Sequence, residues 1–206
     1  MPKKKKKSEP TNCRTHPDIA KRRDTDTTSP PHPRKGVNHL SSSLSAFRTG
    51  ITKLQYAWAG VTTVRGESRR LFVENLPTKK GQFVDETFII NKRTPRISEK
   101  EYVRIKPREK AKLNWDDKLT LEFNGDAPVC QSIRIEPADP SVITVFLCGN
   151  STVVDQDNEP WASWGQMIPH FFGTDVCIAN YAESGESANT FIGAGRLKKA
   201  LSQMKK

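Results

Sequence analysis

The chain has 206 residues, which suits one or two domains, and its 34 Lys and Arg outnumber its 23 Asp and Glu, for a formal net charge of +11. Residues 1–50 hold 12 basic and 4 acidic side chains, or +8, which leaves +3 for residues 51–206, so the charge does not by itself indicate a nucleic-acid-binding surface on the folded part. The longest largely apolar run, residues 142–148, is far shorter than the ~20 residues of a membrane-spanning helix. We therefore expect no helix that spans a membrane.

The first fifty residues have the composition of a disordered segment. They contain six of the fourteen prolines, a Ser-rich stretch and no apolar periodicity. The consecutive lysines at 3–7 are followed by polar residues instead of the apolar core of a signal peptide, so no export signal is readable. We expect residues 1–50 to form a disordered basic tail, which is solvated or, alternatively, serves as a nuclear address or a patch for polyanions.

Residues 51–139 have the pattern of an all-β domain. Short segments rich in apolar and β-branched residues are separated by Pro and Gly at intervals of about a dozen residues, as in a β-sandwich. The pattern predicts strands at 62–65, 70–74, 82–91, 102–106, 118–123 and 132–136.

From residue 140 onward the pattern changes to that of a parallel α/β domain. Residues 142–147 and Val176–Asn180 are apolar enough for strands buried on both faces, while 163–172 and 194–206 have helical spacing. The order strand, helix, strand, helix indicates the beginning of a parallel sheet. Because two strands and two helices cannot cover both faces of such a sheet, we expect a further strand to follow and the chain to be a fragment.

Two polar loops follow the two predicted parallel strands. The first contains Gly149, Asn150 and Ser151, and the second contains Gly185 and Ser187. The carboxyl ends of parallel strands form the ligand crevice of α/β folds, so a Ser hydroxyl and free N–H groups there could attack a carbonyl and stabilise an oxyanion. The alternative is ordinary turn chemistry with Ser as a helix cap.

The remaining candidate groups have structural alternatives. The spacing of Cys148 and Cys177 indicates no metal site, and we interpret both as buried thiols in strands. His170 could serve as the base that a Ser nucleophile needs, although its place in the predicted helix 163–172 does not favour that role.

Three carboxylates form either a cluster or a solvated loop, and we expect the loop: Asp155, Asp157 and Glu159. Three aromatic residues could form a sugar platform, but we favour helix-to-sheet core packing for them: Trp161, Trp164 and Phe171.

The sequence resembles a known enzyme family. The stretches TVFLCGNSTVVDQDNEPWASWGQMIPHFF, VCIANYAESGES and RLKKALSQMKK resemble the rhamnogalacturonan acetylesterases of the GDSL or SGNH hydrolase superfamily. TVRGESRRLFVENLPTKKGQF, FIINKRTPRI, VRIKPRE and NWDDKLTLEFNG resemble the β-sandwich that precedes the esterase domain in gut-bacterial members. The resemblance implies a multi-domain β plus α/β fold: a galactose-binding-like β-sandwich at 51–139, then at 140–206 the start of a flavodoxin-like three-layer α/β/α SGNH hydrolase domain, C-terminally truncated.

The resemblance also implies an activity and a site. It places the nucleophile and one oxyanion N–H at Ser151 and the second N–H at Gly185, with Asn150 where the superfamily usually has Asp. The family's oxyanion Asn and its Asp-x-x-His, which supplies the base, would follow Lys206 and are filled by no residue here. We therefore expect the parent protein to hydrolyse acetyl esters on pectic rhamnogalacturonan and this chain to be an inactive fragment.

The resemblance sets further expectations. The partner would be an acetylated pectic polysaccharide or oligosaccharide, with no cofactor, no metal, no membrane and no nucleic acid, and the protein would be secreted or periplasmic. One alternative is a non-catalytic carbohydrate-binding β-sandwich that uses Trp58, Tyr102 or Trp115. The other is an anion-binding or nucleic-acid-binding protein led by the basic tail.

Overall fold

The computed structural model describes residues 38–43, 49–56, 60–81, 83–112, 114–125, 128 and 130–204. Most of the predicted basic tail lies outside these residues. Strands predominate over helices in the described part. None of the helices in these ranges has the length and apolar character needed to cross a bilayer.

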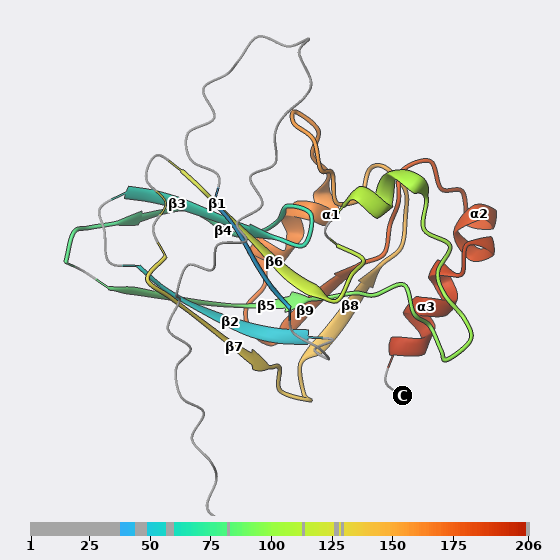
Figure 1. The fold of residues 1–206 in the computed structure, drawn as a ribbon, viewed down its shortest axis with the longest axis horizontal. Helices are drawn as coiled ribbons and strands as arrows, with labels where there is room; N and C mark the ends of the chain where they lie inside the picture. Colours follow the sequence, from blue (N-terminus) through green and yellow to red (C-terminus); the bar gives the residue numbers. More distant parts are fainter. Residues whose placement is uncertain are drawn as a thin grey trace, which may run out of the picture.

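Seven strands form two antiparallel sheets that face each other (Figure 1). The first has the order β1 (Asn38–Ser43), β6 (Lys118–Asn124), β3 (Gly60–Gly66) and β4 (Arg70–Thr78). The second has the order β5 (Val84–Asn91), β2 (Thr49–Tyr56) and β7 (Ser132–Pro137).

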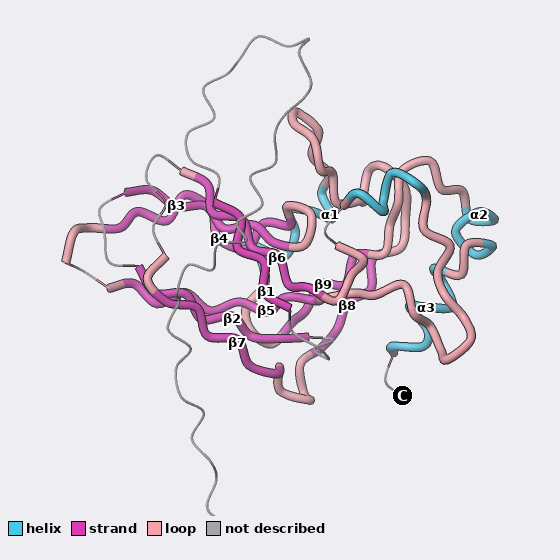
Figure 2. The backbone as a smooth tube through the Cα atoms, viewed as in Figure 1, coloured by secondary structure: helices cyan, strands magenta, loops and turns pink. Residues whose placement is uncertain are grey.

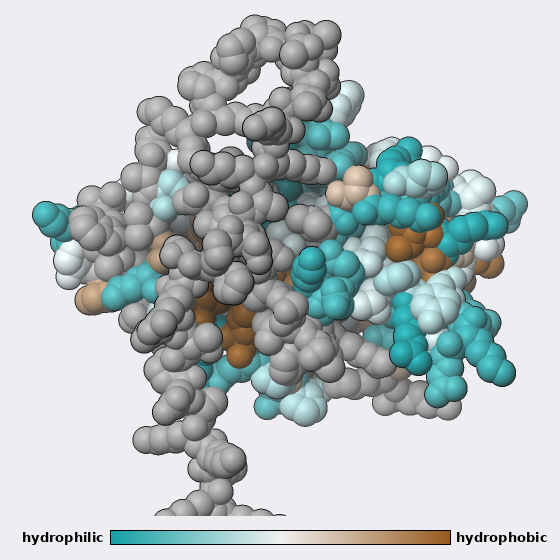
Figure 3. All heavy atoms as spheres, viewed as in Figure 1, coloured by the Kyte–Doolittle hydropathy of each residue, from teal (hydrophilic) through white to brown (hydrophobic). Residues whose placement is uncertain are grey.

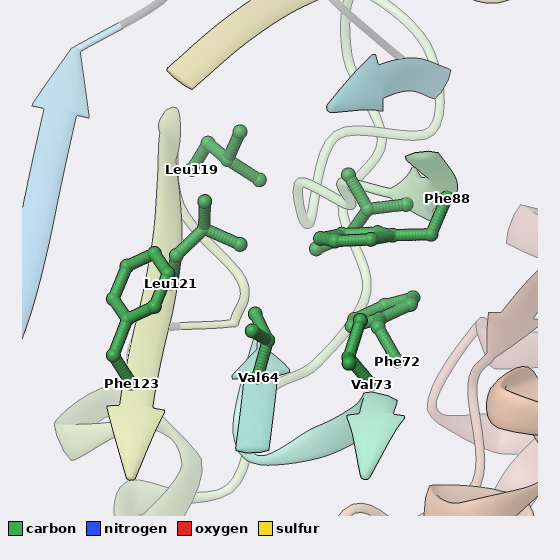
Figure 4. Packing of buried hydrophobic residues seen from close by; sticks show 8 residues of the cluster. Val64, Phe72, Val73, Phe88, Leu119, Leu121 and Phe123 are labelled. Carbon is green, nitrogen blue, oxygen red and sulfur yellow. The ribbon is translucent and has the colours of Figure 1, made fainter. Parts of the chain in front are cut away.

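One hydrophobic core lies between the two sheets. Figure 4 shows its side chains, which come from β3, β4 and β6 on one side and from β5 on the other: Val64, Phe72, Val73, Phe88, Leu119, Leu121 and Phe123. The rings of Phe72 and Phe88 stack with their centroids 4.6 Å apart and so join the sheets directly. Burial of these large apolar side chains is the main stabilising contribution to this part of the fold.

The ordered β part begins earlier than the predicted boundary at residue 50. Strand β1 pairs along its whole length with β6, from Asn38 opposite Phe123 to Ser43 opposite Lys118. Strand β2 pairs with both β5 and β7 and is the middle strand of its sheet. The prediction of disorder through residue 50 is therefore wrong at its C-terminal end, because pairing with β6 supplies a partner that the Ser-rich sequence of β1 does not reveal.

The segment between β5 and β6 is largely irregular, and its predicted strand at 102–106 is wrong. It contains one short 3₁₀-helix, η1 (Pro107–Ala111), and one isolated bridge between Arg96 and Tyr102. Its apolar residues pack instead against the C-terminal part of the chain, in a cluster formed by Val103, Trp115, Tyr181, Phe191 and Ala200. A segment assigned from sequence to the β domain thus covers the α/β part.

Strands β8 (Ile143–Leu147) and β9 (Val176–Asn180) pair in parallel, as predicted, and lie side by side (Figure 2). The expectation that both strands are buried on both faces holds for β9 but not for β8, where Ile143 is 62% exposed. In the described residues β8 pairs with β9 alone, so its other edge has no partner strand there.

Four short helical segments accompany the parallel strands: α1 (Trp164–Met167), η2 (Ile168–Phe171), α2 (Ala188–Gly193) and α3 (Arg196–Gln203). The predicted helix at 163–172 changes from α to 3₁₀ at Ile168, where Pro169 removes an N–H donor. The predicted helix at 194–206 begins at Arg196, after Gly195 with a φ of 79°, and α2 precedes it.

Candidate functional site

The Ser151 turn follows directly on the end of β8. The Asn150 carbonyl accepts hydrogen bonds from the N–H groups of Val153 and Val154, both at 3.0 Å. The Asn150 side-chain oxygen accepts from the N–H of Thr152 at 3.3 Å and from its hydroxyl at 3.1 Å. Asn150 therefore caps this turn, as a short polar side chain commonly does, and Ser151 is left exposed to solvent.

The loop that follows β9 lies beside this turn. The N–H of Tyr181 donates to the carbonyl of Leu147 at 2.9 Å, and the N–H of Glu183 donates to the carbonyl of Gly149 at 3.2 Å. These bonds continue the β8–β9 pairing into the two loops. The predicted meeting of the loops is thus observed, while the oxyanion roles of Ser151 and Gly185 stay predictions.

Gly185 occupies a backbone conformation that suits glycine. Its φ is 71°, in the left-handed region that a side chain disfavours. The preceding carbonyl, that of Ser184, accepts a hydrogen bond from Lys106 Nζ at 2.8 Å and another from Arg108. The irregular segment before β6 therefore holds the Gly185 loop in place.

Two carboxylates flank Gly185 and pair with the same segment. Glu183 lies 2.7 Å from Arg108, and Glu186 lies 2.7 Å from Lys106. Burial acts to raise the pKa of the Glu186 carboxyl, but hydrogen bonds from Lys106 and Thr190 outweigh it and keep that pKa below its ordinary value. The Glu186 carboxyl is therefore ionised near neutral pH, and its ion pair with Lys106 holds the loop in place.

Asn180, at the end of β9, connects the two loops. Its side-chain nitrogen donates to the carbonyl of Val153 at 2.6 Å and to Asp155 Oδ1 at 2.9 Å. Its side-chain oxygen accepts from the N–H of Ala182 at 3.2 Å. The sequence places Asn180 at the start of the second polar loop but predicts no role for it, because its partners Val153 and Asp155 are distant in the chain.

Asp155 is fully buried between two arginines from the β part. Its Oδ2 lies 3.4 Å from Arg70 Nε and 3.3 Å from Arg93 Nη2. Burial raises the pKa of Asp155, and the two guanidinium groups lower it in part. The interpretation of this carboxylate as part of a solvated loop is wrong, because Arg70 and Arg93 compensate its charge within the protein.

The other two carboxylates of that loop also pair with cations. Asp157 lies 3.5 Å from Lys112, and Glu159 lies 2.6 Å from Arg69. No group of metal-ligating side chains occurs in the described ranges. These carboxylates fasten the loop to the β part.

His170 contacts β4 rather than the Ser151 turn. Its Nδ1 lies 3.2 Å from the carbonyl of Phe72, and its Nε2 lies 4.0 Å from the carboxylate of Glu74. The ring also packs edge-on against Phe171. These contacts give His170 a structural role.

The two cysteines near the site have different environments. Cys177 is fully buried in β9, as predicted, but Cys148 is exposed because β8 ends at Leu147. Partial desolvation raises the pKa of the Cys148 thiol above its ordinary value of 9.0. The thiolate is the nucleophilic form, so this shift lowers the reactivity of Cys148 near neutral pH.

Three aromatic side chains before, on and after α1 face solvent, contrary to the favoured core packing. Trp161 is 69% exposed, Trp164 is 51% exposed and Phe171 is 76% exposed. Gly165 of α1 instead packs closely on the turn, since a Cβ there would lie 2.2 Å from the carbonyl oxygen of Val153.

The three aromatic residues proposed for sugar binding by the β part differ in their exposure to solvent. Trp115 is buried and stacks on Tyr181, with ring centroids 5.7 Å apart, so it cannot contact a sugar. Tyr102 is exposed. Trp58 lies outside the described residues.

Three contacts fasten α1 and the residue before it to the Ser151 turn. The hydroxyl of Ser163 donates to the carbonyl of Val154 at 2.5 Å, and Gln166 Nε2 donates to the carbonyl of Gln156 at 2.7 Å. Gln156 Nε2 in turn donates to the carbonyl of Ser151 at 3.1 Å. The exposed Trp164 is therefore carried on a segment held against the candidate nucleophile.

Comparison with known proteins gives a partial relationship. No family model matches the chain. The rhamnogalacturonan acetylesterase RhgT of Bacillus subtilis (strain 168) is 44% identical over 57 residues, which are 27% of this chain and 25% of the relative. The chain thus spans about a quarter of that relative's length, and over the matched stretch it is similar to an esterase.

A solved structure, that of protein YXIM from Bacillus subtilis, is 22% identical to the chain and has a TM-score of 0.33, covering 82% of this chain and 43% of the other. A TM-score of this size does not indicate a shared fold.

Proposed function

We propose that this chain carries the nucleophile-bearing part of a carbohydrate esterase of the GDSL or SGNH superfamily, which removes acetyl groups from pectic rhamnogalacturonan outside the cytoplasm. The two facing sheets would be the β-sandwich of such a protein, and β8 with β9 the opening of its parallel sheet. The observation that carries the proposal is an exposed Ser151 at the carboxyl end of β8, hydrogen-bonded through its turn to the Gly185 loop. The similarity to an acetylesterase over 57 residues supports the same reaction.

The reaction would proceed through an acetyl-enzyme. The Ser151 hydroxyl oxygen attacks the acetyl carbonyl carbon while a base takes its proton, and the bond from that carbon to the sugar oxygen breaks as the base passes the proton to that oxygen. Water then attacks the acetyl-serine and releases acetate. The N–H groups of Ser151 and Gly185 would donate to the oxyanion that forms in each step.

The missing element is a base for the Ser151 proton. A Ser hydroxyl is a weak nucleophile without an adjacent base, and His170 is engaged with β4. The resemblance places the base in an Asp-x-x-His segment that these 206 residues do not contain. We therefore expect the isolated chain to release acetate at the background rate.

Supplying the base from the relative tests the proposal. Residues 38–204 would be joined to the part of the Bacillus subtilis acetylesterase that follows the matched stretch, and acetate release from acetylated rhamnogalacturonan would be measured. We expect turnover by the fusion and a loss of about three or more orders of magnitude in Ser151→Ala. A well-folded fusion without turnover, or equal rates with and without the Ser151 hydroxyl, would contradict the proposal.

A further inference from the structure

Two cations from the segment between β5 and β6 converge on one peptide bond of the Gly185 loop. Lys106 Nζ donates to the carbonyl oxygen of Ser184 at 2.8 Å, and Arg108 Nη2 donates to the same oxygen. A Cβ on Gly185 would lie 4.0 Å from each of these two nitrogens. Figure 1 shows η1, in green, next to the loop after β9, and Figure 3 shows mainly hydrophilic residues on the surface there. Both cations therefore act on the peptide that joins Ser184 to Gly185.

This peptide also carries the N–H that the proposed reaction assigns to the oxyanion. Gly185 is exposed, and its N–H has no hydrogen-bond partner among the residues that the structure describes. The peptide is trans, so its C=O and its N–H point in opposite directions. Because the C=O of Ser184 faces the two cations, the N–H of Gly185 points away from them and is available to another acceptor.

The two cations are themselves held in place. Lys106 Nζ lies 2.7 Å from the carboxylate of Glu186, and Arg108 Nε donates to Glu183 at 2.8 Å. Both carboxylates belong to the Gly185 loop and are almost fully buried. Each cation therefore bonds a carboxylate and the Ser184 carbonyl at the same time, which fixes the plane of the peptide more firmly than a single contact would.

A cation on a carbonyl oxygen changes the other end of the same peptide. It draws electron density toward the oxygen, and this polarisation leaves the N–H more positive and a stronger donor. Stabilisation of an oxyanion depends on donors that are oriented before the reaction begins. Orientation and polarisation of this N–H would both come from a segment that belongs to the β part of the sequence.

We propose that Lys106 and Arg108 are positioning residues for the Gly185 N–H: they fix the direction of this donor and increase its positive charge. The use of the N–H by an oxyanion rests on the proposed function. Its direction and its polarisation are properties of the chain alone, so they can be tested without an ester.

A single NMR signal reports on this peptide, because Ser followed by Gly occurs once in the 206 residues, at Ser184. Cell-free synthesis with carbonyl-¹³C serine and ¹⁵N glycine makes it the one peptide with both labels, and exchange of its N–H with water is measured at pH 8. Hydroxide takes the N–H proton to form water, and water then returns a proton to the peptide anion. The negative charge of that anion is shared by the carbonyl oxygen, so cations bonded to the oxygen speed the exchange.

Three variants of the 206-residue chain test the two cations. Lys106→Met should slow exchange of the Gly185 N–H about tenfold and move the Ser184 carbonyl ¹³C signal upfield, because a charge-assisted hydrogen bond is lost. Arg108→Met should act in the same direction, and its side chain is 53% exposed, so the fold should tolerate the change. Lys110→Met removes the same charge from an exposed neighbour in η1 and should leave both observables unchanged.

The sign of the effect separates this role from simple attachment of the loop. If Lys106 and Arg108 only fastened the loop, their loss would leave exchange of the exposed N–H unchanged or make it faster. Either result would overturn the proposal, as would a stationary carbonyl signal or equal slowing in Lys110→Met. The other glycine signals show whether each variant is folded. Acetate release plays no part, so a failed esterase assay and a failed exchange measurement are separate results.

Discussion

At the residue scale, Glu67 is a buried carboxyl with a strongly altered protonation equilibrium. It lies in the turn between β3 and β4, and one of its oxygens accepts the N–H of Thr120 at 3.0 Å. The nearest cation is Arg70, whose Nη2 is 3.9 Å from the other oxygen. Burial raises the pKa of Glu67 from 4.5 to about 7, although Arg70 and Thr120 act against it. Folding therefore favours the protonated form.

This shift predicts a loss of stability as pH rises. The contribution of Glu67 is fully present below about pH 4.5 and is lost as pH rises through about 7. Glu67→Gln keeps an acceptor for Thr120 without the charge, so it should be near neutral at pH 4.5 and more stable than the parent by up to roughly 3 kcal/mol at pH 8. Urea unfolding at several pH values measures this difference. Glu99→Gln, on an exposed loop, should keep the parental pH dependence, and a pH-independent effect of Glu67→Gln would contradict the assignment.

Two exposed tryptophans make a second prediction at this scale. Trp164 begins α1, which packs on the Ser151 turn, and Trp161 precedes it by three residues, so both offer flat apolar faces that the proposed polysaccharide could contact. Trp161→Ala and Trp164→Ala should each weaken binding of an acetylated rhamnogalacturonan oligosaccharide roughly threefold to tenfold, measured by titration of the 206-residue chain. Tyr102→Ala removes an equally exposed aromatic side chain from another part of the surface and should have no effect. The opposite result would favour sugar binding by the β part.

At the element scale, the strands were predictable where side-chain pattern and burial agree. The predicted strands at 70–74, 118–123 and 132–136 correspond to β4, β6 and β7, because alternating or continuous apolar residues there point into the core. The strand expected at 102–106 failed because Val103 and Ile105 satisfy the same pattern by packing on Tyr181 and Phe191 without a neighbouring strand. Apolar periodicity indicates that side chains are buried, but it does not indicate which element packs against them.

The contact between α1 and the Ser151 turn yields a prediction for an element. In an isolated helix, Ala is more favourable than Gly by about 1 kcal/mol. At Gly165 the new Cβ would lie 2.2 Å from the Val153 carbonyl oxygen and 3.1 Å from Asn180 Nδ2, so α1 would have to shift. We expect Gly165→Ala to destabilise the protein by about 1–3 kcal/mol despite its better helix propensity, as measured by urea unfolding.

Gly193 provides the matched control for this substitution. It ends α2, and a Cβ there would meet its nearest atom, Arg104 Nη2, at 3.9 Å, an ordinary contact. Gly193→Ala should be neutral or stabilising by up to about 1 kcal/mol. If both variants were equally stable, the close packing of α1 on the turn would be refuted.

At the scale of the whole molecule, the sequence indicated two domains but not how they depend on each other. The loops after β8 and β9 could be foreseen because parallel strands place their carboxyl ends together, and the bond between Glu183 and Gly149 confirms that arrangement. The pairing of Asp155 with Arg70 and Arg93 could not be foreseen, because these partners are 85 and 62 positions away in the chain. Arg70 also donates to the carbonyl of Ile178 at 3.3 Å and to that of Asn91 at 2.8 Å, and so it connects β4, β5 and β9.

These connections predict that the β part does not keep its stability alone. A chain shortened to residues 38–139 loses the partners of Val103 and Trp115 in their shared cluster, and it leaves Arg70 and Arg93 without Asp155. Newly exposed apolar surface and uncompensated buried cations both disfavour the folded state. Compared with residues 38–204, the shortened chain should unfold at a lower urea concentration and bind the dye ANS.

Asp155→Asn in the longer chain isolates the charge contribution. It should lower the urea midpoint of unfolding without dye binding, because the apolar cluster stays buried. An unchanged midpoint in the shortened chain would show that the two sheets fold independently of β8 and β9.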